Sequence, residues 1–195
     1  MLALARNPAF LRYANPPALA SNVITSPNDQ SNASWNVKYE MTTVVSNTTL
    51  APDGSMDADK IGPTVTNDFH GVAQTTLTTT GGTWIARARL KQAGNPFGRL
   101  IVGSTNTYTK NSSIIFDLGR GTIANAASIT YVGAPSVRRL ANGWLLYEII
   151  IPSVDANSTH RLNIDIYRDP NTNSFAGVTA SGLYVWGVEF APAPN

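Results

Sequence analysis

The sequence of 195 residues contains no cysteine. A disulfide, a thiolate nucleophile and a cysteine metal site are therefore excluded, and stability has to come from packing and assembly. Charged residues are also scarce, at 13% of the chain, which is about half the share usual in globular proteins. A surface solvated by hydroxyl and amide groups instead is more typical of secreted, cell-surface and virion proteins than of cytosolic enzymes.

Long apolar runs are absent as well. No stretch approaches the ~20 apolar residues that a membrane helix needs, and the apolar run in residues 1–6 is too short for a signal peptide. We therefore expect neither a membrane span nor a cleaved export signal. The net charge is +2 and the basic residues are spread along the chain, so nucleic-acid binding is not expected.

Signatures of catalysis are few. There is no Gly-x-Ser-x-Gly elbow and no phosphate-binding glycine loop. The two histidines, His70 and His160, are far apart and neither has a second metal-ligand residue at i+4, so no histidine zinc site is predicted. His70 is interpreted as a structural hydrogen-bonding residue. Glycoside hydrolysis would need two convergent carboxylates. The candidate carboxylates are Asp57, Asp59, Asp165, Asp169, Glu148 and Glu189. Their spacing in the sequence does not show which of them converge in the fold, and we expect that the protein is not an enzyme.

From residue 22 onward the pattern is strand and turn. In residues 84–91 the side chains alternate, with Trp84, Ala86, Ala88 and Leu90 expected inward. In residues 183–190 both faces are apolar, so Leu183 and Val185 are expected on one face, and the even positions, Trp186 and Val188 among them, on the other. At least eight short strands without helical periodicity predict an all-β fold, an antiparallel jelly-roll β-sandwich over residues 22–195 with an extended N-terminal arm over residues 1–21.

The N-terminal arm cannot form a useful helix because Pro8, Pro16 and Pro17 interrupt it. Its apolar side chains are nonetheless costly to leave in water. Two interpretations stay open, a disordered terminus and an arm that becomes ordered against another subunit, and we favour the second. The assembly residues are then Phe10, Leu11 and Tyr13.

Candidate contacts with a partner lie on the polar face of the strand that begins at Trp84. Arg87, Arg89 and Lys91 alternate there, and Arg99 begins the next strand after a short turn, so the four cations are expected on one side of a hairpin. They form either a solvated edge that discourages aggregation or a contact with an acidic partner surface or an anionic glycan. Tyr108, in a polar loop segment, is the candidate platform on which a sugar ring would stack.

Several short motifs occur in a characteristic order. They are Asn22-Val23-Ile24 with Ala33-Ser34-Trp35, Ala51-Pro52-Asp53-Gly54 with Ala58-Asp59-Lys60, Gly71-Val72-Ala73-Gln74, Phe116-Asp117-Leu118 with Gly121-Thr122, Asn142-Gly143-Trp144, and the closing Leu183-Tyr184-Val185-Trp186-Gly187. Together they resemble the carbohydrate-binding-module-like β-sandwich domains of bacteriophage virion proteins, over residues 22 to 190.

The resemblance implies a non-enzymatic virion structural protein, of the capsid-decoration or short-fibre type, attached to capsid or tail proteins in part through its arm. It also implies a homo-oligomer, most simply a trimer. The alternative is a carbohydrate-binding adhesion module that recognises host surface glycans. No cofactor is predicted. Because related sandwiches hold calcium near their first and last strands, a calcium site stays open, with Asp53, Asp57, Asp59 and Glu189 as the oxygen ligands.

Overall fold

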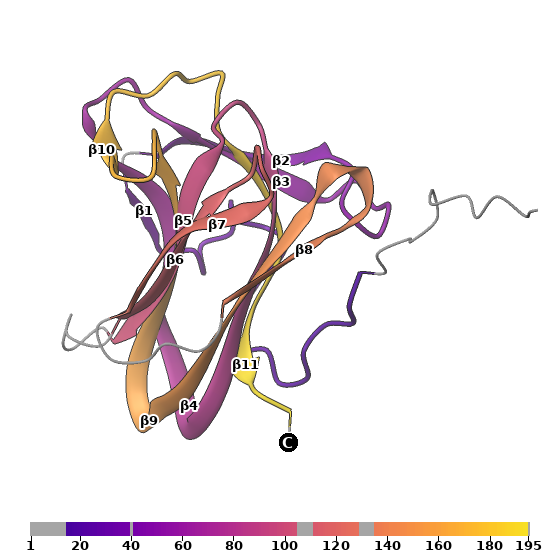
Figure 1. The fold of residues 1–195 in the computed structure, drawn as a ribbon, viewed down its shortest axis with the longest axis vertical. Coiled ribbons are helices and arrows are strands. Elements are labelled where there is room, and N and C mark those ends of the chain that lie inside the picture. Colours follow the sequence, from indigo (N-terminus) through magenta and orange to yellow (C-terminus); the bar gives the residue numbers. More distant parts are fainter. Residues whose placement is uncertain (1–14, 40, 105–110, 129–134, 195) are drawn as a thin grey trace, which may run out of the picture.

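The protein is an all-β antiparallel sandwich, as the sequence predicts (Figure 1). The computed structural model describes residues 15–39, 41–104, 111–128 and 135–194. Among them are eleven strands and a short 3-10 turn, and no helix long and apolar enough to span a membrane. The strands are β1 (Val37–Tyr39), β2 (Met41–Thr49), β3 (Ala58–Pro63), β4 (Asp68–Gln92), β5 (Phe97–Ser104), β6 (Asn111–Asp117), β7 (Thr122–Ser128), β8 (Ser136–Arg139), β9 (Leu145–Tyr167), β10 (Ser174–Phe175) and β11 (Leu183–Pro192).

Two long strands, β4 and β9, run through both layers of the sandwich. They pair with each other from His70 opposite Ile166 to Leu90 opposite Leu145. Irregularities in their register lie between Gln74 and Trp84, where Gly81 and Gly82 have positive φ values of 83° and 86°. At this point both strands bend from one layer into the other, at the lower end of Figure 1. The sequence predicted shorter, separate strands because the pair Gly81-Gly82 is typical of a turn, whereas the pairing of β4 with β9 continues through it.

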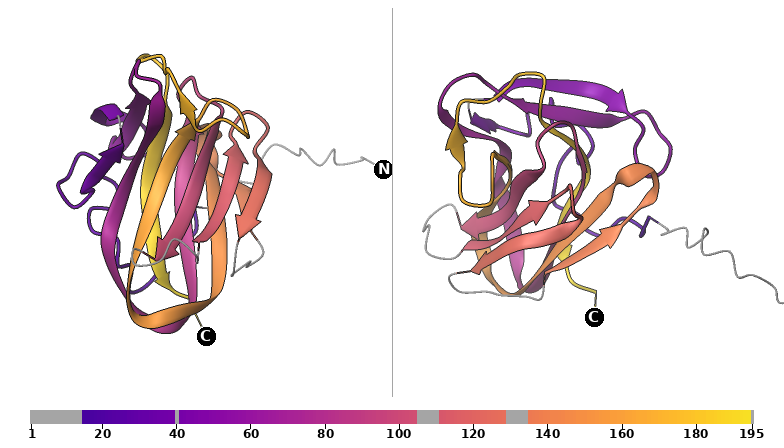
Figure 2. Two further views of the ribbon diagram at one scale, coloured as in Figure 1. Left: turned by 90° about the vertical axis from the view of Figure 1, so that its left-hand side faces the viewer. Right: turned by 45° about the horizontal axis from the view of Figure 1, so that its top comes forward.

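The bend divides the paired strands into two sheets (Figure 2). Sheet 1 contains the first part of β4 and the last part of β9, with β1 beside β4 and with β5, β6 and β7 in order beyond β9. Sheet 2 contains the last part of β4 and the first part of β9, with β11, β3 and β2 on one side and β8 on the other. The short strand β10 pairs with the start of β4.

Residues 37–49 change sheets, although the alternation of side chains in residues 37–45 predicts one continuous strand there. Val37 pairs with Ala73 of β4 in sheet 1, whereas Met41 pairs with Pro63 of β3 in sheet 2. The strand is thus split into β1 and β2, and Tyr39 belongs to sheet 1. A change of pairing partner does not alter the alternation of side chains, so the pattern alone does not reveal it.

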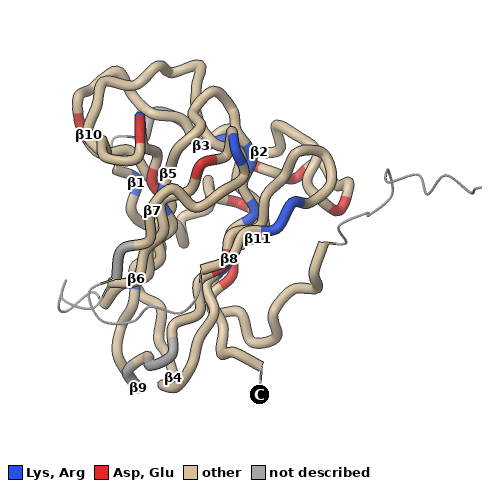
Figure 3. Tube along the Cα trace, in the orientation of Figure 1, with Lys and Arg blue, Asp and Glu red and all other residues tan. Residues whose placement is uncertain are grey.

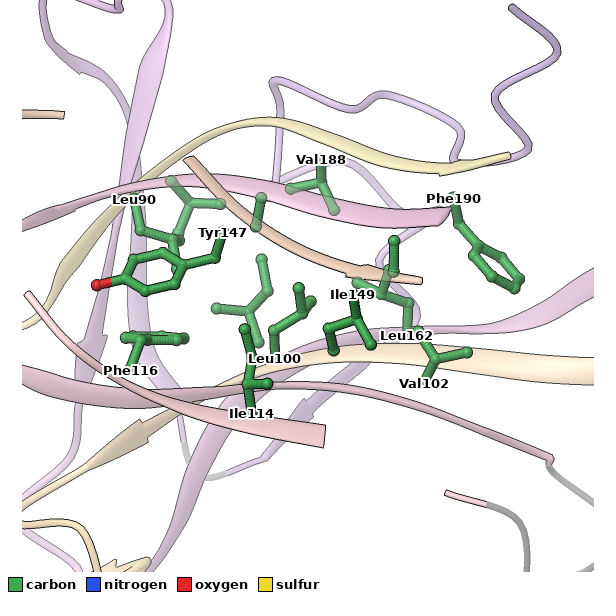
Figure 4. Close-up of a cluster of buried hydrophobic side chains, with 14 of the residues drawn as sticks. Leu90, Leu100, Val102, Ile114, Phe116, Tyr147, Ile149, Leu162, Val188 and Phe190 are labelled. Atoms are coloured by element: carbon green, nitrogen blue, oxygen red, sulfur yellow. The ribbon is translucent and has the colours of Figure 1, made fainter. Parts of the chain in front are cut away.

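The main core lies between the two sheets. Trp84, Ala86, Ala88 and Leu90 are all buried in it, which confirms their predicted orientation. Figure 4 shows part of this cluster, with side chains from both sheets packed together. Burial of apolar side chains is the dominant favourable term in folding, and a domain without disulfides depends on it for most of its stability.

The closing strand β11 departs from the expected alternation. Leu183 and Val185 point into the main core, and so do Val188 and Phe190, which were expected on the opposite face. The cause is a β-bulge between Trp186 and Glu189, where Gly187 has a left-handed φ of 57°. An extra residue in one strand reverses the facing of every residue after it.

Trp186 therefore lies outside sheet 2 rather than between the layers. It is 8% exposed and belongs to a second, smaller cluster, and its indole Nε1 donates a hydrogen bond to Asp57 Oδ1 at 2.8 Å. The loop before β3 and the turn before β9 cover this cluster; its other members are Ala51, Ala58, Leu140, Trp144 and Leu146.

The bulge predicts a specific cost for a side chain at position 187. In Gly187→Ala the alanine would have to adopt the left-handed φ, and its Cβ would lie 2.8 Å from Arg89 Nη1. Gly54→Ala is the matched control, since Gly54 has a φ of 94° but nothing within 4 Å of a new Cβ. We expect the control to lose about 1–2 kcal/mol of unfolding free energy from backbone strain, and Gly187→Ala about 1–2 kcal/mol more. Chemical denaturation measures both, and equal losses would contradict the proposed contact with Arg89.

Candidate functional site

The four predicted cations do not share one side of a hairpin. Arg87, Arg89 and Lys91 lie on the outer face of sheet 2, whereas Arg99 is on β5, which pairs with β9 and not with β4. The hairpin was expected because the turn between the two segments is short, but the structure inserts β9 between them. Figure 3 shows how sparse the charged positions are, and that basic positions lie near acidic ones.

Arg89 is buried and organises the outer face of sheet 2. Only 2% of the residue is exposed. Its guanidinium donates hydrogen bonds to the carbonyl of Gly187 at 2.7 Å, to Asn15 Oδ1 at 2.7 Å and to the carbonyl of Pro16 at 3.1 Å. It also forms an ion pair with Glu189 at 3.4 Å. Arg89 therefore links residues 15 and 16 to the sandwich.

The neighbouring cations are also engaged. Arg87 forms ion pairs with Glu148 and Glu189, and Lys91 Nζ lies 6.0 Å from the centroid of the Tyr184 ring. The outer face of sheet 2 is thus built around paired charges. The expectation that these cations contact a partner remains untested.

A pocket of about 300 Å³ lies on the outer face of sheet 1. Its lining combines aromatic rings with amide, guanidinium and carboxylate groups: Tyr39, Phe69, His70, Arg99, Arg161, Asn163, Asp165 and Asn173. Strand register explains how they meet. Tyr39 of β1 is opposite Gly71 of β4, Gly71 is opposite Asp165 of β9, and Asp165 is opposite Arg99 of β5.

Gly71 leaves space at the centre of this row. A Cβ atom at this position would lie 2.5 Å from Asp165 Oδ1 and 2.8 Å from the carbonyl oxygen of Ile164. Any side chain at residue 71 would therefore displace the Asp165 carboxylate. Because Gly71 has no side chain, the surface of sheet 1 has a gap between Tyr39 and Asp165.

Asp165 and Arg99 form the charged pair of the pocket. Arg99 donates to Asp165 Oδ2 from both Nε, at 2.9 Å, and Nη2, at 2.5 Å. Its guanidinium also lies 5.5 Å from the centroid of the Tyr167 ring, in a cation–π contact. Burial raises the pKa of the Asp165 carboxyl, while the positive charges of Arg99 and Arg161 act in the opposite direction.

Asn163 supplies a hydrogen-bond acceptor to the pocket. The residue is 4% exposed, and its side-chain Oδ1 is buried without a hydrogen-bond partner. Buried acceptors are rarely left unpaired in folded proteins, because the loss of water costs free energy that no bond returns. A bound molecule with a hydroxyl or amide donor would satisfy this atom.

The rim of the pocket is aromatic. Phe69 is 50% exposed, which is high for a large apolar side chain, and Tyr39 is half-buried. His70 is buried, and its Nε2 lies 2.7 Å from the carbonyl oxygen of Phe175. This contact agrees with the structural role predicted for His70.

No metal cluster is found in the described part of the chain. The carboxylates considered for calcium are occupied by protein donors. Asp59 accepts from the backbone N–H groups of Gln30, at 2.8 Å, and Asn47, at 3.0 Å, Asp57 accepts from Trp186, and Glu189 is paired with arginine. The calcium alternative gains no support from these residues.

Of the contact residues predicted from the sequence, Arg99 lines the pocket. Tyr108 and the arm residues Phe10, Leu11 and Tyr13 lie outside the described residues. The remaining pocket residues were not recognised as a site. A signal was present in residues 161–167, where three different polar groups, a guanidinium, an amide and a carboxylate, alternate with Leu162, Ile164 and Ile166 and so share the outer face of one strand.

Loss of the guanidinium beside Asp165 should destabilise the fold in a pH-dependent way. In Arg99→Ala the buried carboxylate keeps its desolvation but loses its main counter-charge, so its folded-state pKa rises further above the ordinary 3.8. Folding then disfavours the ionised form of Asp165, which lowers the free energy of unfolding. This loss is absent below the pKa of Asp165 in the unfolded chain, and it grows as the pH rises from there through the higher pKa in the folded chain. We expect a loss of about 2–3 kcal/mol at neutral pH and a much smaller loss near about pH 3.5.

Denaturation of the wild type and the variant at both pH values measures this difference. The double variant Arg99→Ala/Asp165→Asn is the control, because without the carboxylate the excess loss at neutral pH should disappear. An equal loss at both pH values would show that Arg99 acts through packing alone.

Comparison with known proteins supports the fold. No family model matches the sequence, and neither does any curated protein. Among solved structures, the enzymatically active domain of tailspike protein 4 of bacteriophage CBA120 is similar, with a TM-score of 0.50 and 9% identity over 87% of this chain and 21% of that chain. A chain described as "CBM4 structure and function" has a TM-score of 0.44 and 12% identity over 85% of this chain and 92% of that chain. The present chain thus spans about a fifth of the tailspike chain, and the likeness to it concerns the fold.

Proposed function

We propose that this chain is a non-enzymatic carbohydrate-binding adhesion module of a bacteriophage virion, which binds a surface glycan in the pocket on sheet 1. The observation that carries the proposal is that Asn163, whose Oδ1 is a buried acceptor without a partner, lines a pocket together with the rings of Tyr39 and Phe69. Such an atom needs a donor, and a sugar presents hydroxyl donors on a ring with apolar faces.

The remaining groups of the pocket suit the same ligand. The exposed ring of Phe69 and the half-buried ring of Tyr39 offer flat apolar surfaces for a sugar ring. Arg99, Arg161 and Asn173 add polar groups to the lining of the pocket. A pocket of about 300 Å³ is at the lower end of the range for small-molecule sites, which fits a short part of a longer glycan better than a whole chain.

The pocket chemistry favours binding over hydrolysis. Glycoside hydrolases of the common types place two carboxylates about the scissile bond. Among the described lining residues Asp165 is the one carboxylate, and it is held by Arg99. The bacteriophage context rests on the sequence motifs, with support from the fold likeness to a phage tailspike domain.

A second candidate is a virion structural protein attached through its N-terminal arm, as a decoration or short fibre. The observation in its favour is the fixation of residues 15 and 16 by Arg89 on the outer face of sheet 2. Residues 15 and 16, the first described residues of the arm, thus lie on the face opposite the pocket. Both functions are compatible in one protein, with capsid or tail proteins and further copies of this chain as the partners.

Glycan binding can be tested at the rim of the pocket. Phe69→Ala should weaken binding about tenfold without loss of stability, because the exposed ring contributes stacking but little core packing. Met56→Ala is the matched control, since Met56 is 58% exposed and lies in the loop before β3 of sheet 2. Affinity gel electrophoresis against neutral and acidic polysaccharides measures both variants. Equal retardation of the two variants by a bound polysaccharide would place the site elsewhere.

The arm hypothesis makes a separate prediction. If Phe10, Leu11 and Tyr13 pack against neighbouring copies, the full chain should sediment as a trimer, at three times the 20.8 kDa of one chain. Replacement of all three by serine should yield monomers with an unchanged melting temperature, since the strands lie beyond the arm. A wild-type chain that sediments as a monomer at micromolar concentration would contradict the trimer and favour the interpretation of the arm as a disordered terminus.

A further inference from the structure

A second hollow lies on the outer face of sheet 2, beside Arg87. Its volume is about 350 Å³, and it is lined by residues 16–20, Arg87, Pro192 and Pro194. The described part of the N-terminal arm thus forms it together with the C-terminal end of β11 (Figure 1). We call it the proline groove. A volume at the lower end of the range for small-molecule sites suits a few side chains better than a folded element.

The lining of the proline groove is apolar. Four of its residues are prolines, namely Pro16, Pro17, Pro192 and Pro194. Proline has no backbone N–H to donate, and the other residues of the segment 16–20 are alanine and leucine. Among the described lining residues Arg87 is the one charged group, and it is paired with Glu148 and Glu189. A polar ligand would find few hydrogen-bond partners here, so the groove favours an apolar occupant.

The chain itself contains a segment of this kind. Phe10, Leu11 and Tyr13 precede the described residues by a few positions, and their burial would remove apolar surface from water. Aromatic rings pack against proline rings where aromatic-lined grooves recognise proline-rich segments. The arm therefore carries the side chains that a proline-lined groove would receive.

The conformation of the chain at residues 15–17 favours the arm of another copy as the occupant. A proline disfavours the helical conformation of the residue before it, so Pro16 and Pro17 keep Asn15 and Pro16 extended. Arg89 also holds this point of the chain, through Asn15 Oδ1 at 2.7 Å and the carbonyl of Pro16 at 3.1 Å. An extended chain that is held here is poorly suited to turn back onto residues 18–20 of the same copy.

We propose that the proline groove of each copy receives Phe10, Leu11 and Tyr13 from the arm of a neighbouring copy. This inference rests on the arm-mediated assembly given above as the second candidate function, and it identifies the surface that the arm binds. Arm and groove are different surfaces, so their contact is heterologous. Heterologous contacts close into a ring when the rotation between copies allows it, and a ring of three copies is the expected trimer.

A charge in the groove tests the proposal. Ala20→Asp places a carboxylate at an exposed position of the lining. Ala176→Asp is the matched control, since Ala176 is also exposed and lies in the loop after β10. In sedimentation equilibrium of the full chain, Ala20→Asp should raise the dissociation constant of the oligomer at least about tenfold, because an apolar contact would desolvate the charge. Ala176→Asp should change it by less than about twofold, and thermal melting verifies that both variants are folded.

The absence of cysteine from the sequence allows a direct test of the contact. Arg12→Cys retains the three apolar arm residues, and Ala20→Cys supplies a thiol at the groove. Chains with one change each, marked by different tags, are mixed and treated with a short bismaleimide. We expect a cross-linked product that contains both tags. We expect no such product when Ala20→Cys is replaced by Val178→Cys, at a residue that is 65% exposed in the loop after β10.

The outcomes distinguish the groove from the assembly on which it rests. An oligomer that Ala20→Asp leaves intact, but that serine at positions 10, 11 and 13 dissociates, would overturn the groove and retain arm-mediated assembly. Cross-links only within single chains of Arg12→Cys/Ala20→Cys would show that the arm binds the groove of its own copy, which also overturns the proposal. A wild-type chain that is monomeric at micromolar concentration would overturn both the groove contact and the assembly.

Discussion

The continuous pairing of β4 with β9 through the bend is the constraint on which the rest of the structure depends. Because each strand belongs to both sheets, this pairing joins the two sheets, although the register shifts between Gln74 and Trp84 at the bend. Gly71 and Arg89 lie on the same strand β4, one at the pocket and the other at the anchor of the N-terminal segment. On β9, Asp165 is opposite Gly71, and Glu148 is opposite Arg87, two residues before Arg89. A shift of one residue within either half would turn the outward residues of that half toward the core.

Charged residues are few in this chain, and several of them form ion pairs with little exposure. Arg87 is directly opposite Glu148, and Arg99 is directly opposite Asp165. Pairs of this kind gain little net stability, since the removal of both charges from water offsets their attraction. Their cross-strand positions do give a reason for them: in a shifted register each would leave a charge in the apolar core. We therefore interpret them as determinants of register more than of stability.

Much of the fold could be predicted from local sequence, and the exceptions have a common physical origin. The inward face of residues 84–90 follows from alternation alone, and so does the all-β class. The reversal after Trp186 does not, because it depends on the left-handed conformation of Gly187 beside Arg89 of the neighbouring strand. The change of sheet between Tyr39 and Met41 likewise depends on which strand each half pairs with. In each case the deciding contact is distant in sequence.

The candidate site was missed for the same reason. Its central row comes from four strands, and only the register brings Tyr39, Asp165 and Arg99 together. Alternation within residues 161–167 could have shown a polar face, but not that a glycine on the next strand leaves the space beside it. Prediction of such a pocket requires strand order and register, neither of which a single sequence of this composition provides.

The two outer faces of the sandwich have different properties, and this difference connects the two proposed roles. The outer face of sheet 2 contacts residues 15 and 16 and the second apolar cluster, and residues 16–20 line pockets there together with Arg87 and Arg89. The outer face of sheet 1 keeps an open pocket with an exposed aromatic rim. A chain that is held to a particle through its N-terminal arm would therefore be fixed by the side of sheet 2. Its sheet 1 would then face away from the particle, which is the orientation that a glycan-binding surface requires.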